Sequence, residues 1–162
     1  MNYLKIYDCD MVNGEGVRVT LFLSGCDHAC HGCYNQHSWN PDHGEKFTEL
    51  LQQRVLDMVD LPHISGLSLT GGDPLYHGNL PDVLGLLRNF RARFGSTKNV
   101  WLWSGYTLGE INSGGYGEGE MRREIVSLVD VFIDGRFEQD KYDANLPFRG
   151  SSNQIIHRFT EF

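Results

Sequence analysis

The sequence lacks any run close to the roughly 18 consecutive apolar residues that a membrane-spanning helix needs. Its N-terminus also lacks the cationic start and apolar stretch of a signal peptide. Positive charge is scarce, because 14 Lys and Arg stand against 21 Asp and Glu, for a formal net charge of -7. We therefore expect a cytoplasmic protein that binds neither membranes nor nucleic acid, since nucleic-acid binding requires clustered positive charge.

Cysteine is also scarce, and three of the four cysteines lie in the run Cys26-x3-Cys30-x2-Cys33. Disulfides are not expected in a cytoplasmic protein. Three thiolates so close in sequence can instead hold one small metal centre. Iron-sulfur clusters are usually held by four cysteine thiolates, so a site with three leaves one iron without a protein ligand. We expect Cys9, which lies upstream in a predicted strand, to be a buried structural residue.

Zinc is the alternative metal for the cysteine run. His28, His31 or His37 could complete a tetrahedral site with three cysteines, and the spacing alone does not decide between zinc and a cluster. The seven histidines of the chain lie mostly in predicted loops, so we expect most of them to be solvated instead.

Apolar, β-rich runs alternate with helical patterns along the chain. Strands are predicted at residues 3–8, 17–23, 66–70, 100–103 and 130–134, and helices over residues 48–59, 79–94 and 121–129, with Thr48 and Asn79 as N-caps. This order predicts right-handed crossovers and a mostly parallel sheet. The chain is well short of the ~250 residues of a complete barrel. We therefore expect the α/β class, as a partial (open) TIM-like barrel with outer helices, in a single domain over residues 1–162.

Each chemically suggestive cluster follows a predicted strand. These clusters are the cysteine run, Gly71-Gly72-Asp73-Pro74, Ser104-Gly105-Tyr106 and Asp134-Gly135. Because the C-terminal ends of parallel strands meet at one edge of a sheet, we expect the clusters to share one rim. Trp101 and Trp103 alternate along a strand with Leu102, which indicates packing residues and not a cofactor platform.

The cysteine spacing resembles the signature of the radical S-adenosylmethionine superfamily. Three further segments narrow this resemblance to one family within the superfamily. They are Asn13-Gly14-Glu15-Gly16, Gly71-Gly72-Asp73-Pro74 and Arg149-Gly150-Ser151-Ser152-Asn153-Gln154. With them, the chain from Met1 to about His157 resembles the family of activating proteins of the anaerobic (class III) ribonucleoside-triphosphate reductase.

This resemblance implies a [4Fe-4S] cluster on Cys26, Cys30 and Cys33, with the amino and carboxylate groups of S-adenosyl-L-methionine on the fourth iron. An electron from a donor such as flavodoxin would cleave the cofactor reductively. The 5'-deoxyadenosyl radical would then abstract a hydrogen from a glycine of the reductase, leaving a glycyl radical. No catalytic side chain is expected, because cluster and cofactor carry the chemistry.

The resemblance also implies cofactor contacts, at Gly32, Cys33, Tyr34, Gly71, Gly72 and Asp73. Many relatives have an aromatic residue directly before the third cysteine, where this chain has Gly32. The segment 13–16 would lie beside the active-site opening or form a plain turn, and the segment 149–154 would contact cofactor or partner or form a polar loop. The free protein is expected to be a monomer or a homodimer.

Two other functions stay open at this stage. One is an activase of a different glycyl radical enzyme or a modifier of a small molecule; such activases often carry an extra cysteine-rich insert, and here only Cys9 lies outside the triplet. The other is a zinc-stabilised adaptor domain, which would leave the glycine-rich strand ends unexplained.

Overall fold

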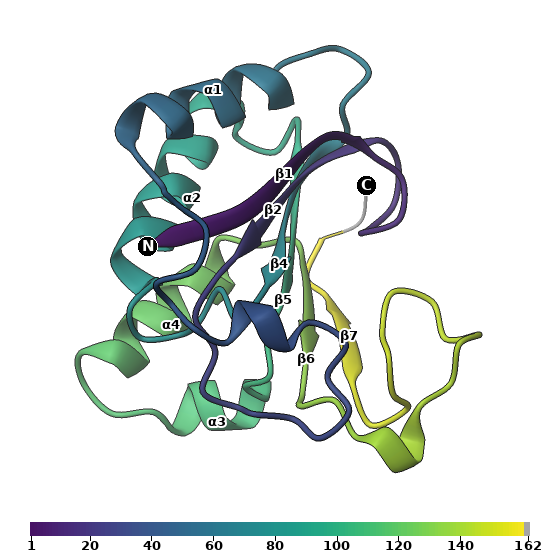
Figure 1. Ribbon diagram of the computed structural model, residues 1–162. Helices are drawn as coiled ribbons and strands as arrows, with labels where there is room; N and C mark the ends of the chain where they lie inside the picture. The colour runs from purple at the N-terminus through teal and green to yellow at the C-terminus, as the bar shows by residue number, and fades with distance from the viewer. Residues whose placement is uncertain (161–162) are drawn as a thin grey trace.

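The computed structural model describes residues 1–160, which contain one seven-stranded sheet (Figure 1). Its strands follow one another in the order β3-β1-β2-β4-β5-β6-β7, so the sheet is open, with β3 and β7 at its ends. The central strands β2, β4, β5 and β6 are parallel, whereas β1, β3 and β7 pair antiparallel to their neighbours. The strands are β1 (Asn2–Asp10), β2 (Arg18–Leu23), β3 (Glu45–Lys46), β4 (Gly66–Gly71), β5 (Asn99–Trp103), β6 (Val131–Asp134) and β7 (Ile155–Arg158).

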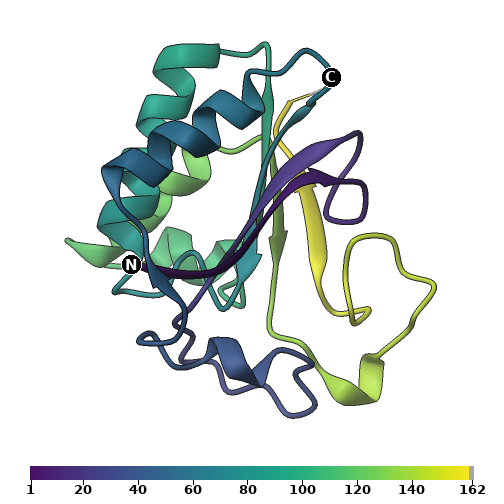
Figure 2. The same cartoon turned by 45° about the horizontal axis from the view of Figure 1, so that its top comes forward.

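The helices connect the parallel strands and cover one face of the sheet. Figure 2 shows α1, α2 and α4 on that face, and the segment between β6 and β7 on the other side. This arrangement confirms the predicted α/β class, with an open sheet, parallel strands and outer helices. In the described part of the chain, no helix is both long and apolar enough to cross a membrane. The helices are α1 (Glu49–Val59), α2 (Leu80–Phe94), α3 (Leu108–Ser113) and α4 (Glu118–Ser127), with 3-10 turns η1 (Gln36–Ser38) and η2 (Gln139–Lys141).

The two predicted N-caps behave differently. Thr48 caps α1 as expected, because its side-chain oxygen accepts a hydrogen bond from the backbone N–H of Leu51 at 3.2 Å. Asn79 occupies the N-cap position of α2, but its side chain does not cap the helix. Its amide instead donates to the carbonyls of Ser24 and Asp73, at 2.9 and 3.0 Å. The buried Asn79 therefore ties the start of α2 to the loops that follow β2 and β4.

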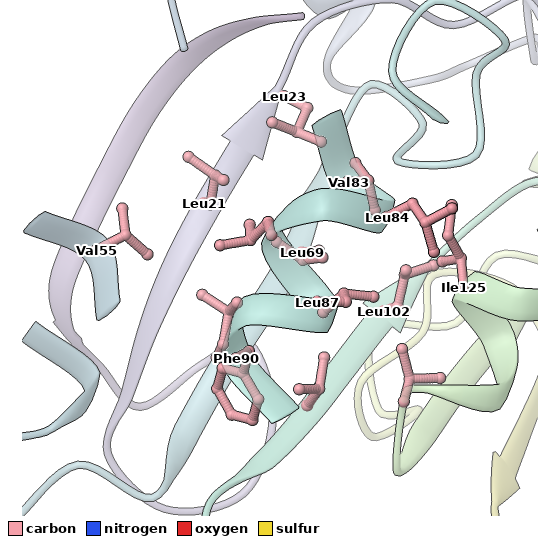
Figure 3. Packing of buried hydrophobic residues seen from close by; sticks show 14 of the residues in the cluster. Leu21, Leu23, Val55, Leu69, Val83, Leu84, Leu87, Phe90, Leu102 and Ile125 are labelled. Atoms are coloured by element: carbon pink, nitrogen blue, oxygen red, sulfur yellow. The ribbon is translucent and has the colours of Figure 1, made fainter. Parts of the chain in front are cut away.

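The main core lies between the sheet and the helices (Figure 3). Leu21, Leu69 and Leu102 point from the strands toward Leu87 and Phe90 of α2, and all five are buried. Burying each such side chain contributes about 1.5–3 kcal/mol. This packing fixes the parallel strands in register, and so fixes where their C-terminal ends lie.

The opposite face of the sheet carries a smaller aromatic cluster. Because side chains alternate along a strand, β5 directs Leu102 toward the helices and Trp101 and Trp103 away from them. Trp101 is fully buried and packs edge-on against Phe148 at 4.9 Å between ring centroids. The indole N–H of Trp103 donates to the Phe148 carbonyl at 2.7 Å. Trp101 therefore packs, as predicted, whereas the half-buried Trp103 packs and also lines the cavity described below.

Besides β3 and the two 3-10 turns, the structure adds the elements α3 and β7, and it corrects one residue. The short helix α3 begins with a capping box between Thr107 and Glu110, and β7 pairs antiparallel to β6; neither element was predicted. The expectation that Cys9 is buried is wrong, because its side chain is exposed. Cys9 lies in the part of β1 that does not pair with the short edge strand β3.

Candidate functional site

A cavity of about 600 Å³ opens at the C-terminal ends of the parallel strands. Its walls come from the loops after β2, β4, β5 and β6, which confirms that the clusters after these strands share one rim. The cavity brings together all the predicted site residues: Cys26, Cys30, Gly32, Cys33, Tyr34, Gly71, Gly72 and Asp73.

The cysteine loop reverses direction sharply within a few residues. Gly25 and Gly32 adopt positive φ angles of 96° and 77°, and Ala29 does so at 47°. The backbone N–H of Cys33 donates to the Cys30 carbonyl at 3.1 Å, which closes a tight turn between these two cysteines. All three thiols of the run are half-buried and line the cavity. The loop therefore presents three sulfurs to one space.

Gly32 lies directly against the side chain of Gln139, which belongs to η2. A Cβ atom at position 32 would overlap the amide oxygen of Gln139, and the positive φ would strain any larger residue. A larger residue at position 32 would therefore displace the end of the Gln139 side chain and adopt a strained backbone conformation. Gln139 was not among the predicted site residues, because it comes from a segment with no recognisable pattern.

Burial raises the pKa of the Cys26 thiol to about 12. The nearby backbone N–H of His28 acts in the opposite direction and lowers the pKa of Cys26, whereas the charges of Asp73, Cys30 and Cys33 raise it further. Burial also raises the pKa of Cys30. Burial thus favours the protonated thiols, whereas a bound metal centre would favour the thiolates that serve as its ligands.

The distances between the three cysteine sulfurs indicate which metal centre the loop fits. Among residues 1–160, the ligand atoms of Cys26, His28 and Asp73 are the only three that lie within 4.8 Å of one another. The three cysteine sulfurs are thus spread more widely, whereas zinc at about 2.3 Å from each would bring them to about 3.8 Å apart. A four-iron cluster is a larger body than one ion, and it binds thiolates. The donor set and its spread fit a cluster better than zinc.

The group of Cys26, His28 and Asp73 is not a ready zinc site either. Nε2 of His28 lies 2.6 Å from Oδ2 of Asp73, which is a hydrogen-bond distance. Two ligands of tetrahedral zinc, each about 2.0–2.1 Å from the metal, lie about 3.3 Å apart. His31 and His37, the other predicted zinc ligands, are exposed.

The expectation that histidines are solvated is wrong for His28. Its side chain is 6% exposed, and its ring packs edge-on against Tyr106 at 4.6 Å between ring centroids. Gly105 lies so close to the ring that a Cβ there would overlap it. His31, His37, His63 and His77 are exposed, as predicted.

The carboxylate of Asp73 is buried and saturated with hydrogen bonds. Oδ2 accepts from the Ser104 hydroxyl and from the backbone N–H of Gly105, both at 3.0 Å, in addition to its bond with His28. Oδ1 accepts from the backbone N–H of Leu75 at 2.7 Å. Asp73 therefore joins the end of β4 to the end of β5 and to the cysteine loop.

The two glycines before Asp73 let the chain pass close to β2. A Cβ on Gly71, which has a φ of 111°, would overlap the backbone of Leu23, and a Cβ on Gly72 would overlap the backbone of Gly25 and Ser38. Side chains at these positions would push the turn away from the cysteine loop. The glycine pair thus keeps the backbone of the turn within the cavity wall.

The segment 13–16 connects β1 to β2, and Val12 and Asn13 line the cavity. Asp10 accepts hydrogen bonds from the backbone N–H of Val12 at 2.8 Å and from the side chains of Asn13 and Thr20, both at 2.6 Å. Burial alone would raise the pKa of Asp10, but these hydrogen bonds outweigh it and lower the pKa. Asp10 thus fixes the loop at the cavity edge.

The buried Arg18 supports the same loop through a second set of hydrogen bonds. Arg18 donates to the Glu15 carbonyl at 3.0 Å and to the Ser68 hydroxyl at 2.7 Å, and Ser68 in turn donates to the Asn13 carbonyl at 2.5 Å. Burial lowers the pKa of Arg18 to about 10. The connection between β1 and β2 is therefore held by hydrogen bonds to Asp10 at its start and to Arg18 and Ser68 beneath it in the sheet.

The segment 149–154 is folded around the side chain of Gln154. Its amide oxygen accepts from the backbone N–H of Gly150 and Ser151, at 2.9 and 3.1 Å, and its amide nitrogen donates to the Gly135 carbonyl at 2.9 Å. Nη1 of Arg149 donates to the Gln154 carbonyl at 2.6 Å. These bonds anchor the segment to the end of β6.

Arg149 is the one Lys or Arg that lines the cavity among the residues that the structure describes. Its Nε is buried and has no hydrogen-bond partner within residues 1–160. A buried donor without an acceptor costs about 1–3 kcal/mol. Arg149 therefore adds a positive charge to the wall of the cavity, which suits an anionic ligand.

The remaining wall of the cavity was not predicted. It comes from the irregular segment between β6 and β7, where no periodic pattern marks a residue as lining a site. Four of its apolar or aromatic side chains line the cavity: Phe137, Tyr142, Leu146 and Phe148.

Comparisons with known proteins agree with this geometry. A family model described as a 4Fe-4S single cluster domain matches residues 12–157. The chain is 46% identical, over all of both chains, to the anaerobic ribonucleoside-triphosphate reductase-activating protein of Pasteurella multocida. It is 42% identical to the Escherichia coli K12 protein of that name, covering 97% of this chain and 98% of the relative. It is 43% identical to that of Enterobacteria phage T4, covering 99% and 96%.

Proposed function

Because the chain belongs to the family of anaerobic ribonucleoside-triphosphate reductase-activating proteins, we propose that it activates this reductase with a [4Fe-4S] cluster held by Cys26, Cys30 and Cys33. The observation that carries the assignment of ligands is the cysteine loop, which directs three half-buried thiols into one cavity. Three protein ligands leave one iron of the cluster open, and an open metal position can bind a small molecule directly.

The small molecule that we assign to the cavity is S-adenosyl-L-methionine. A volume of about 600 Å³ lies within the roughly 300–1,000 Å³ typical of small-molecule sites. When bound, cluster and cofactor supply the reductive cleavage and the hydrogen abstraction that produce a glycyl radical on the reductase. The electron would come from a donor such as flavodoxin.

The chain itself binds and orients the cofactor. We assign contacts with it to Gly32, Cys33 and Tyr34 on the cysteine loop, and to Gly71, Gly72 and Asp73 on the turn after β4. The glycines let the backbone approach the ligand closely. The saturated carboxylate of Asp73 acts by holding its turn in place. Arg149, the positive charge of the cavity, pairs with the carboxylate of the cofactor's methionine half.

The reductase would approach at the edge of the cavity. Val12 lines the cavity and is 76% exposed, and the adjacent Met11 is 74% exposed, so the connection between β1 and β2 presents apolar side chains at the opening. Hydrogen bonds to Asp10 and Arg18 hold this connection rigidly. A glycine-bearing segment of the reductase would meet the cavity here.

The test is anaerobic reconstitution with iron and sulfide, followed by incubation with reductant, S-adenosyl-L-methionine and the anaerobic reductase. Electron paramagnetic resonance should detect a glycyl radical on the reductase, and the protein should carry about four irons per chain. A radical that forms only when a different glycyl radical enzyme replaces the reductase would identify another activase. Stoichiometric zinc without iron or sulfide in anaerobically purified protein would contradict the cluster and favour an adaptor domain.

A further inference from the structure

We propose that His28 is a positioning residue that holds the Cys26 sulfur in a fixed relation to the turn after β4. The proposal rests on the proposed cluster and assigns a role to a residue that is neither a ligand nor a cofactor contact. His28 lies between two of the cysteines, yet its ring points away from solvent and toward Asp73.

The ring of His28 is held on several sides. Nε2 lies 2.6 Å from the Asp73 carboxylate, and both side chains are buried. Tyr106 packs against the ring, and the guanidinium of Arg122 lies 4.5 Å from the centre of the Tyr106 ring. Gly105 closes the remaining space. The ring therefore has one well-defined position, although it lies on a loop.

His28 lies beside Cys26 in the cysteine loop and contacts Asp73 through its ring. Nε2 of the ring lies 2.6 Å from the Asp73 carboxylate. The sulfur, a ring nitrogen and a carboxylate oxygen of these three residues all lie within 4.8 Å of one another. One residue thus links a cluster ligand to the turn on which cofactor contacts are proposed.

The link has consequences for a bound cluster. Hydrogen bonds to the ligand sulfurs and charges beside them set the reduction potential of iron-sulfur clusters, and outer partners also orient the ligands. Without the ring donor, Asp73 would keep only the hydroxyl and backbone donors of Ser104, Gly105 and Leu75. Its negative charge would then be less compensated beside Cys26, which makes reduction of the cluster harder.

The test compares His28→Leu, His28→Gln and His28→Asn with the wild-type protein after anaerobic reconstitution. A glutamine places its amide N–H near the position of Nε2, whereas an asparagine is too short to reach Asp73. The measurements are the midpoint potential of the cluster by redox titration, the affinity for S-adenosyl-L-methionine without reductase, and thermal unfolding.

We expect a more negative potential and weaker binding of S-adenosyl-L-methionine in His28→Leu and His28→Asn, by a factor comparable to the roughly 10- to 100-fold loss of metal affinity or activity on removal of outer partners of metal ligands. His28→Gln should retain most of both properties. The matched control is His157→Leu, because His157 lies 3.0 Å from Asp134 and neither residue lines the cavity. This control should lower thermal stability at most.

Unchanged potential and affinity in His28→Leu, with or without a lower melting temperature, would reduce His28 to a residue that only stabilises the fold. If His28→Leu takes up no cluster, equal behaviour of His28→Gln and His28→Asn would overturn the proposal. Failure of the wild-type protein to bind a cluster or to produce a glycyl radical would instead contradict the proposed function.

Discussion

Gly32 of the cysteine loop packs against the side-chain amide of Gln139, a residue more than a hundred positions later in the chain. The contact joins the loop that carries the proposed cluster ligands to the segment that closes the far wall of the cavity. The φ angle of 77° favours glycine at position 32, and a side chain there would also displace the end of the Gln139 side chain.

The first prediction concerns this contact. Gly32→Ala should lower the free energy of unfolding by about 1–2 kcal/mol or more, because alanine is strained at positive φ and its Cβ overlaps Gln139. Urea unfolding of the iron-free protein measures the change. Gly115→Ala is the control, since Gly115 has no neighbour within 4 Å of an added Cβ and no positive φ. Equal stabilities of the two variants would contradict the packing described here.

The second prediction concerns the cluster ligands. Replacement of Cys26, Cys30 or Cys33 by alanine should abolish cleavage of S-adenosyl-L-methionine, because each removes one of only three protein ligands. Iron and sulfide analysis and cofactor cleavage check the result. Cys9→Ala should behave as the wild type, since Cys9 is exposed and does not line the cavity. Retained cleavage in any triplet variant would refute the assignment.

The third prediction concerns Arg149. Arg149→Gln should weaken binding of S-adenosyl-L-methionine roughly ten- to a hundredfold, because a hydrogen bond to a charged group contributes about 1.5–3 kcal/mol. Arg149→Lys should lose less, since it keeps the charge. Titration calorimetry on the reconstituted protein measures both affinities.

Methylthioadenosine serves as the matched ligand for this experiment, because it lacks the carboxylate. Its affinity should be the same in the wild type and in Arg149→Gln. Arg88→Gln is the protein control, since Arg88 is exposed and pairs with Glu124 outside the cavity. An equal loss for both ligands in Arg149→Gln would show that Arg149 does not recognise the carboxylate.

The fourth prediction concerns the pH dependence of stability at Asp10. Hydrogen bonds lower the pKa of Asp10 in the folded protein below its ordinary value of 3.8. A depressed folded pKa stabilises the protein above the unfolded pKa, and this contribution is lost as the pH falls through the folded pKa. Asp10→Asn should therefore be less stable than the wild type at pH 7, with a smaller difference below pH 4.

Paired urea unfolding curves at pH 7 and pH 3 check this prediction. Asp57→Asn is the control, because Asp57 is exposed and its ion pair with Arg93 lies on the helical side of the molecule. A stability difference for Asp10→Asn that is the same at both pH values would contradict an ionised, hydrogen-bonded Asp10.

Local patterns predicted most elements of the fold. The alternation of side chains along β5 predicted that Leu102 and Trp101 lie on opposite faces of the sheet. The helical spacing of apolar residues predicted the buried face of α2. The helix α3 was missed although its capping box, Thr107 to Glu110, is visible in the sequence, because six residues are too few to show a helical period. The strand β7 was missed because its residues are only partly buried and show no clear alternation.

The sequence by itself determined the loop proposed to bind the cluster, since the three cysteines are close in the chain and their spacing is a local property. It also determined the glycine turn after β4, because a glycine pair at the end of a buried strand permits close backbone approach. Only the tertiary structure decided that His28 meets Asp73, that the Asn79 side chain ties loops together instead of capping α2, and that Arg149 lines the cavity. These residues come from segments far apart in the chain, and their side chains meet only because core packing sets the strand register and brings the strand ends to one rim.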